Sequence, residues 1–163
     1  MKTLLLLRHA KSSWENPSER DFARPLNARG LQAAPLMGRY LQAHGYQPDI
    51  ILSSPATRAR QTALLVQEAA AFSAPVRYEA AIYEAQLKDL LNLISALDEA
   101  HKLALIVGHN PGLTILLEHL TGCREHLPTA AVAHIQLNQA HWRNIPAGGG
   151  QLSALVKPKQ LSV

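Results

Sequence analysis

Four residues that could together handle a phosphoryl group are spread along this chain: Arg8, His9, Arg58 and His109. Arginine stays cationic, and its planar fork of N–H donors matches phosphate oxygens. Two arginines could hold a phosphoryl group and stabilise the charge on its equatorial oxygens. Neighbouring cations should keep an imidazole between them neutral, and a neutral imidazole has a lone pair that can attack phosphorus. We therefore expect His9 to act as a nucleophile and His109 to donate to a phosphoryl oxygen.

Short apolar runs precede these residues and must position them. The runs cover residues 4–7, 50–52 and 103–107. Uninterrupted apolar runs of this length are typical of parallel strands that are covered on both faces. Ligands in open α/β sheets lie just beyond the carboxyl ends of such strands. If the three strands are parallel and adjacent, the two arginines and two histidines meet there. A helix after Pro111 could add backbone N–H donors for an anion.

The rest of the chain alternates between helical and extended patterns. Helical spacing predicts helices over residues 27–44, 87–97 and 112–120, and Ser53-Ser54-Pro55 is expected to open another that runs to about Ala71. Further strands are expected at 76–78, 131–137 and 152–156, with a glycine turn at 148–150. This order predicts an α/β fold: a doubly wound, mostly parallel sheet flanked by helices in three layers. We expect residues 1–163 to form a single domain.

Composition excludes several classes of function. The 16 Lys and Arg exceed the 12 Asp and Glu by only four, aromatic residues make up 5%, and the arginines are scattered. Nucleic-acid binding would predict clustered basic residues with aromatics between them. We expect an anionic ligand or an acidic protein partner instead.

The apolar segments, the single cysteine and the remaining histidines indicate where the protein is located and whether it binds a cofactor. The run at 4–7 is too short for a signal peptide, and no segment has the length of a membrane span. A single cysteine, Cys123, cannot form an internal disulfide. We therefore expect a cytoplasmic protein with no membrane partner. The other histidines lack metal-ligand spacing and no nucleotide-binding loop is present, so no metal or cofactor is expected.

Three motifs carry a resemblance to a known family. The segment Leu7-Arg8-His9-Ala10-Lys11-Ser12 resembles the Arg-His signature of the histidine phosphatase superfamily, which has the phosphoglycerate mutase-like fold. Segments 53–62 and 107–111 resemble its second and third motifs, in the same chain order. The short chain and segment 21–30 are most similar to the SixA-type phosphohistidine phosphatase branch.

The resemblance implies roles for individual residues. His9 would be the nucleophile that becomes phosphorylated, and the phosphate pocket would consist of Arg8, Arg58 and His109. Glu84, in segment 82–85, matches the position of the general acid. Two departures from the family pattern are Ala10, where glycine is usual, and Asn16, which stands one place later than its counterpart in larger relatives.

The resemblance leaves several functions open. A phosphatase for phosphohistidine in a signalling or phosphorelay protein fits best, because only one amphipathic helix separates Glu84 from the strand at 103 and the pocket would be sparsely covered. A phosphomonoesterase for small phosphorylated metabolites and a non-catalytic phosphate-binding module are the alternatives. We expect Arg60 to be a surface residue, whereas Arg20 and Arg24 could either guide substrate or lie at the surface.

Overall fold

The computed structural model describes residues 1–161, and its centre is one six-stranded sheet. The strands lie in the spatial order β3-β2-β4-β1-β5-β6. Strands β1 to β4 run parallel to one another, whereas β5 is antiparallel to both of its neighbours, β1 and β6. The bounds are β1 Thr3–Arg8, β2 Ile50–Ser53, β3 Val76–Tyr78, β4 Leu103–Gly108, β5 Val132–Leu137 and β6 Gly150–Val156. The predicted α/β class with a mostly parallel sheet is confirmed.

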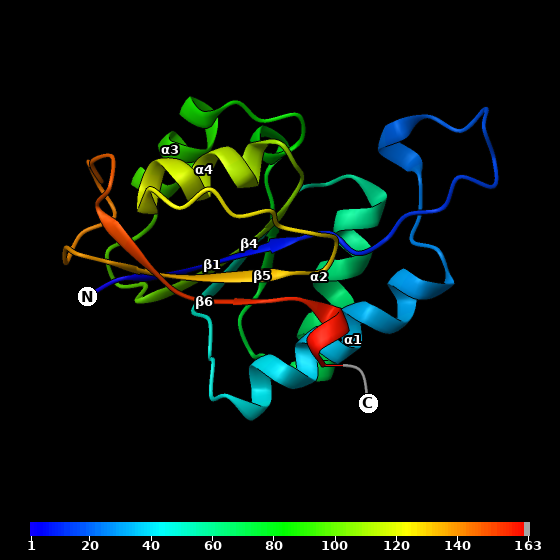
Figure 1. Cartoon of the computed structure of the whole chain (residues 1–163), viewed down its shortest axis with the longest axis horizontal. Coiled ribbons are helices and arrows are strands. Elements are labelled where there is room, and N and C mark those ends of the chain that lie inside the picture. The colour runs from blue at the N-terminus through cyan, green and yellow to red at the C-terminus, as the bar shows by residue number, and fades with distance from the viewer. Residues whose placement is uncertain (162–163) are drawn as a thin grey trace.

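Four α-helices cover the two faces of this sheet. Figure 1 shows α3 and α4 above the sheet and α1 below it, and α1 packs closely against α2. The bounds are α1 Ala28–Ala43, α2 Thr57–Ala70, α3 Leu87–Ser95 and α4 Gly112–Thr121. Short 3-10 helices lie at Asp21–Ala23, Ala80–Ile82 and Pro158–Gln160. None of the helices in residues 1–161 is long and apolar enough to cross a membrane.

The leucines of β1 show why this strand has no polar alternation. Leu4 and Leu6 point into the cluster that includes residues of α3 and α4, while Leu5 and Leu7 point into the cluster that includes residues of α1 and α2. All four side chains are fully buried. Successive side chains of a strand face opposite sides of the sheet, so a strand between two helical layers needs apolar residues at every position.

One helix boundary differs from the prediction. Helix α2 begins at Thr57, after Pro55, and its N-cap is Ala56, which makes no side-chain cap. The Ser54 hydroxyl instead accepts a hydrogen bond from the Ala56 amide at 3.1 Å. The α1 boundaries are close to those predicted: Asn27 caps its start, and Gly45 follows the C-cap in the left-handed region at φ 76°.

The carboxyl ends of three central strands coincide. Arg8 pairs in register with Gly108, and Ser53 pairs with Val107, so β1, β4 and β2 end at the same edge of the sheet. Helix α1 begins directly against the chain that leaves β1, because a Cβ on Gly30 would lie 2.2 Å from the Lys11 carbonyl oxygen. The topology therefore delivers polar residues from distant segments to one place.

Candidate active site

The four residues singled out from the sequence line one cleft at this edge. The cleft has a volume of about 310 Å³, and the His9 and His109 ring centroids are 5.1 Å apart. Its walls are formed by Arg8, His9, Lys11, Ser12, Trp14, Arg24, Arg58, His109, Asn110 and Thr129. The expected convergence of two histidines and two arginines is confirmed, and a third arginine joins them.

His9 is held in one tautomer. Its side chain is 7% exposed, and Nδ1 lies 2.7 Å from the Ala10 carbonyl oxygen. A carbonyl oxygen can only accept, so Nδ1 carries the proton and Nε2 keeps its lone pair. Burial lowers the pKa of His9 to about 4, the bond to Ala10 opposes this shift, and Arg58 and Arg8 add to it. We expected the neighbouring arginines to keep His9 neutral, but burial is the larger cause.

His109 is also neutral. Burial, with smaller contributions from the neighbouring His9 and Arg58, lowers its pKa to about 3. Nε2 lies 2.8 Å from the hydroxyl oxygen of Ser54, a buried residue directly after β2. A neutral imidazole retains one N–H, and the other ring nitrogen of His109, Nδ1, is buried without a hydrogen-bond partner among the described residues.

Asp21 organises the arginines, and sequence reasoning did not assign it a role. The Arg58 guanidinium donates to the Asp21 carbonyl at 2.6 Å and to its carboxylate at 3.0 Å. Arg24 forms an ion pair with the same carboxylate, and the Tyr83 hydroxyl donates to it at 2.7 Å. Burial alone would raise the pKa of Asp21, but the bonds from Tyr83 and Arg58 outweigh burial and lower it. Burial, followed in size by the hydrogen bond to Asp21, raises the pKa of Tyr83 to about 12.

Arg24 is a cleft residue, so the alternative that it lies at the surface is wrong. Its side chain is almost fully buried, and its guanidinium lies 3.4 Å from the centroid of the Trp14 ring. Trp14 itself is 72% exposed at the mouth of the cleft. The only sequence signal was the position of Asp21 and Arg24 in the family-like segment 21–30. In contrast, Arg20 and Arg60 are exposed and do not line the cleft, and the Asn16 side chain accepts hydrogen bonds from Ser18 within its own loop.

Glu84 lies beside this cleft, in an adjoining cavity of about 450 Å³. The two cavities share Arg58, His109 and Asn110. The Glu84 side chain is exposed, and its backbone is in the left-handed region at φ 54°. That conformation is uncommon for residues other than glycine, and it occurs often at functional sites. The structure therefore places Glu84 within the neighbourhood of His109 but not in the wall around His9.

The start of α4 does not present all of its amides to the cleft. The Leu113 amide donates to the His109 carbonyl at 3.0 Å, and the Thr114 amide donates to the Asn110 side chain at 3.2 Å. The expectation that this helix offers its first N–H groups to an anion is wrong for these two donors, because each is already bonded within the chain, Leu113 to a main-chain carbonyl and Thr114 to the Asn110 side chain. Among the described residues, no group of three or more His, Cys, Asp and Glu could hold a metal ion.

Comparison with known proteins places this geometry in a family. The model of the histidine phosphatase superfamily (branch 1) matches residues 4–96. The chain belongs to the histidine phosphatase superfamily. An uncharacterised chloroplastic protein of Arabidopsis thaliana is 34% identical over 96% of this chain and 78% of its own length. An uncharacterised protein of Mycobacterium tuberculosis is 31% identical over 94% of this chain and its full length.

Solved structures of this superfamily have the same fold. A protein of Agrobacterium tumefaciens assigned as the phosphohistidine phosphatase SixA has a TM-score of 0.84 and 32% identity, over 96% of this chain and 98% of its own. The protein histidine phosphatase SixA in complex with tungstate has a TM-score of 0.86 and 21% identity, over 98% of this chain and 99% of its own. The resemblance inferred from the motifs is thus confirmed for the superfamily and for the SixA-like fold.

Proposed function

We propose that this histidine phosphatase removes phosphoryl groups from phosphohistidine on other proteins, with His9 as the nucleophile. One observation carries the proposal: the bond from His9 Nδ1 to the Ala10 carbonyl leaves the Nε2 lone pair in a cleft lined by Arg8, Arg24 and Arg58. A buried neutral imidazole among fixed cations suits attack on an anionic phosphoryl group.

In the first step, Nε2 of His9 attacks phosphorus in line with the leaving group. The phosphorus–nitrogen bond of the substrate breaks, its electron pair goes to the departing imidazole, and that imidazole takes up a proton. Arg8 and Arg58 stabilise the charge on the equatorial oxygens, and His109 donates to one of them. These residues supply the charge stabilisation that a metal ion would otherwise provide.

In the second step, water attacks the phosphorus of phosphorylated His9. The bond to Nε2 breaks, the electron pair returns to the ring, and inorganic phosphate leaves. Glu84 is the group that we assign to proton transfer: it would give a proton to the leaving group in the first step and take one from water in the second. Its place beside His109 in the adjoining cavity supports this role.

Two features favour a protein substrate over a metabolite. Only α3 separates Glu84 from β4, and Trp14 stands exposed at the mouth, so the phosphoryl site is accessible to a side chain on another protein. In addition, 32% identity links the chain to a protein assigned as a phosphohistidine phosphatase. A small-molecule phosphomonoesterase with the same core is the second candidate. The expected cytoplasmic location belongs to this proposal.

Rapid-quench trapping with a phosphorus-labelled donor tests the proposal. The wild-type protein should form an acid-labile, base-stable adduct, and His9→Ala should form none and lose turnover. Absence of an adduct in the wild type would indicate a phosphate-binding module. Turnover on a phosphorylated histidine phosphocarrier domain should exceed that on a panel of metabolite phosphates, and the reverse ranking would favour the phosphomonoesterase.

A further inference from the structure

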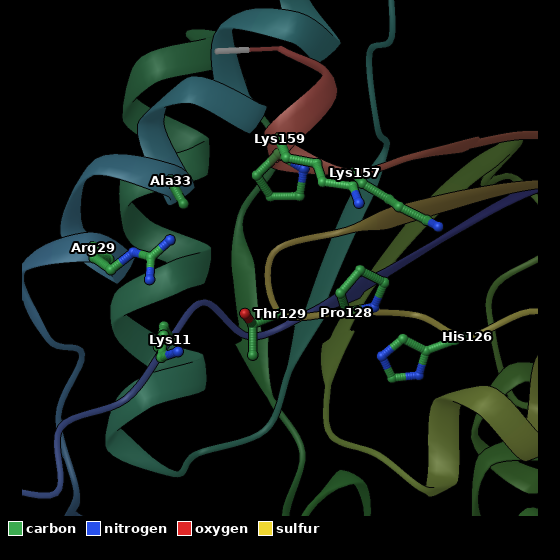
Figure 2. A pocket seen from close by; sticks show the side chains of 9 residues that line it. Lys11, Arg29, Ala33, His126, Pro128, Thr129, Lys157 and Lys159 are labelled. Carbon is green, nitrogen blue, oxygen red and sulfur yellow. The ribbon is translucent and has the colours of Figure 1, made fainter.

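A second cavity, about 380 Å³ in volume, opens next to the catalytic cleft. Lys11 and Thr129 line both, so the two spaces share a wall. Figure 2 shows Lys11 and Arg29 on one side of this cavity and His126 on the other. We call it the basic pocket.

Positive charge gathers in the basic pocket from segments that are distant in the sequence. Lys11 follows β1, Arg29 belongs to the first turn of α1, and Lys157 and Lys159 lie at the C-terminal 3-10 helix. None of the residues that line the pocket is acidic. Within residues 1–161, no carboxylate forms an ion pair with Lys11, Arg29 or Lys157.

This arrangement opposes the stability of the fold. Like charges in one pocket repel, and a cation in the first turn of a helix is unfavourable to the helix dipole. Arg29 occupies such a position, and the first turn of α1 contains no acidic residue. A ligand that brings negative charge would remove both penalties, as expected for a binding site.

We propose that the basic pocket is a subsite for acidic side chains of the phosphorylated protein, close to its phosphohistidine. This inference rests on the proposed function. A ligand that fills both spaces presents its phosphoryl group to His9 and its second negative charge across the wall formed by Lys11 and Thr129. The lysine ammonium groups are point charges on flexible side chains, so they can pair with carboxylates in several orientations.

Two phosphohistidine peptides test this inference, one with aspartates and glutamates around the histidine and one with asparagines and glutamines in their place. The variant is the double substitution Arg29→Gln with Lys157→Gln, which leaves Lys11 in the shared wall unchanged. Arg39→Gln is the matched control, because Arg39 is exposed on the same helix but does not line the pocket. p-Nitrophenyl phosphate, which offers a single anionic group, reports the basal activity.

At low salt, the wild-type protein and Arg39→Gln should prefer the acidic peptide in kcat/KM by about tenfold, the size expected from two exposed charge pairs. The double variant should lose this preference through KM and keep its activity on p-nitrophenyl phosphate. A preference unchanged in the double variant, or lost equally in Arg39→Gln, would overturn the inference. A sugar bisphosphate serves as a third substrate. If the double variant loses kcat/KM on this substrate alone, the pocket binds metabolites and the inference is rejected.

A binding measurement separates this inference from the proposed function. Fluorescence anisotropy of the acidic peptide with unphosphorylated histidine requires no catalysis. Weaker binding to the double variant than to Arg39→Gln supports the subsite, even if neither phosphopeptide is hydrolysed. Equal binding to both variants rejects it, even if both phosphopeptides are hydrolysed.

Discussion

Arg58 donates to Asp21 twice, to the main-chain carbonyl at 2.6 Å and to the carboxylate at 3.0 Å. The guanidinium assigned to phosphate binding is therefore already engaged by a carboxylate of the same chain. These two bonds set the direction of the Arg58 guanidinium, whose side chain is only 8% exposed. It also places a negative charge that a phosphoryl group must displace or tolerate.

We expect Asp21→Asn to strengthen inhibition by inorganic phosphate. The amide keeps the size of the side chain but removes the charge that repels an incoming oxyanion. One charge pair near the surface corresponds to about 1 kcal/mol, so the inhibition constant should fall about fivefold. Steady-state inhibition measures this change, and Glu19→Gln, in the same loop, is the control. Weaker inhibition in Asp21→Asn would show that Asp21 chiefly positions Arg58.

Glu84→Gln should separate two classes of substrate. A phosphoester releases an alkoxide that needs a proton, whereas phosphohistidine releases an imidazole that needs less assistance. We expect kcat to fall by about 100-fold on a phosphoserine peptide, within the usual range for acid catalysis, and far less on phosphohistidine. Glu79→Gln, which removes a nearby carboxylate, should leave both rates unchanged. Equal losses on both substrates in Glu84→Gln would reject the assignment of Glu84 as the acid.

The buried histidines predict a loss of stability in acid. In the unfolded chain their imidazoles bind protons near pH 6.5, whereas folded His9 does so only near pH 4 and His109 near pH 3. As the pH falls below 6.5, the unfolded state takes up protons that the folded state does not. The free energy of unfolding should therefore decrease by about 1.4 kcal/mol per pH unit for each histidine.

Urea unfolding between pH 7 and pH 4 measures this effect, and His9→Gln is the informative variant. Without the His9 imidazole, the decrease over this range should be smaller by about 3 kcal/mol. Carboxylates such as Asp21 titrate in both proteins and cancel in the difference. Parallel curves for wild type and variant would mean that His9 is not held neutral by the fold.

Trp142→Phe should lower stability without changing catalysis. Trp142 is fully buried in the cluster on the α3 and α4 side, and its Nε1 donates to the His101 carbonyl at 2.8 Å. Lys2 lies over its ring and donates to the same carbonyl at 2.7 Å. Phenylalanine removes the donor and leaves a void, which should cost about 2–3 kcal/mol.

Chemical denaturation and kcat on p-nitrophenyl phosphate check this expectation together. Trp142 lies next to the chain that enters β1 and β4, at the end of the sheet opposite the cleft. Trp14→Phe, an exposed tryptophan at the cleft, is the matched control for stability and should leave it nearly unchanged. A loss of kcat in Trp142→Phe that matches the loss in stability would contradict the separation of core and site.

The sequence alone determined the sheet and the main site residues. Four consecutive leucines require cover on both faces, so β1 had to be a central strand with Arg8 and His9 at its end. Parallel strands end at one edge, so Arg58 and His109 were expected at the same place if their strands were adjacent, and the strand order met that condition. The sequence carries this information because the alternation of side chains along a strand, and the residues that follow its end, depend only on consecutive residues.

Only the tertiary structure decided the roles of residues in the loops. Asp21 and Arg24 stand in a polar segment whose spacing does not show which side chains face the site. The contacts that Asp21 makes with Arg58 and Tyr83, and that Arg24 makes with Trp14, arise only in the folded chain. The basic pocket likewise joins cations from both ends of the chain. Burial, the largest cause of the lowered pKa of His9, is a property of the packed molecule and cannot be derived from the residues next to it in the sequence.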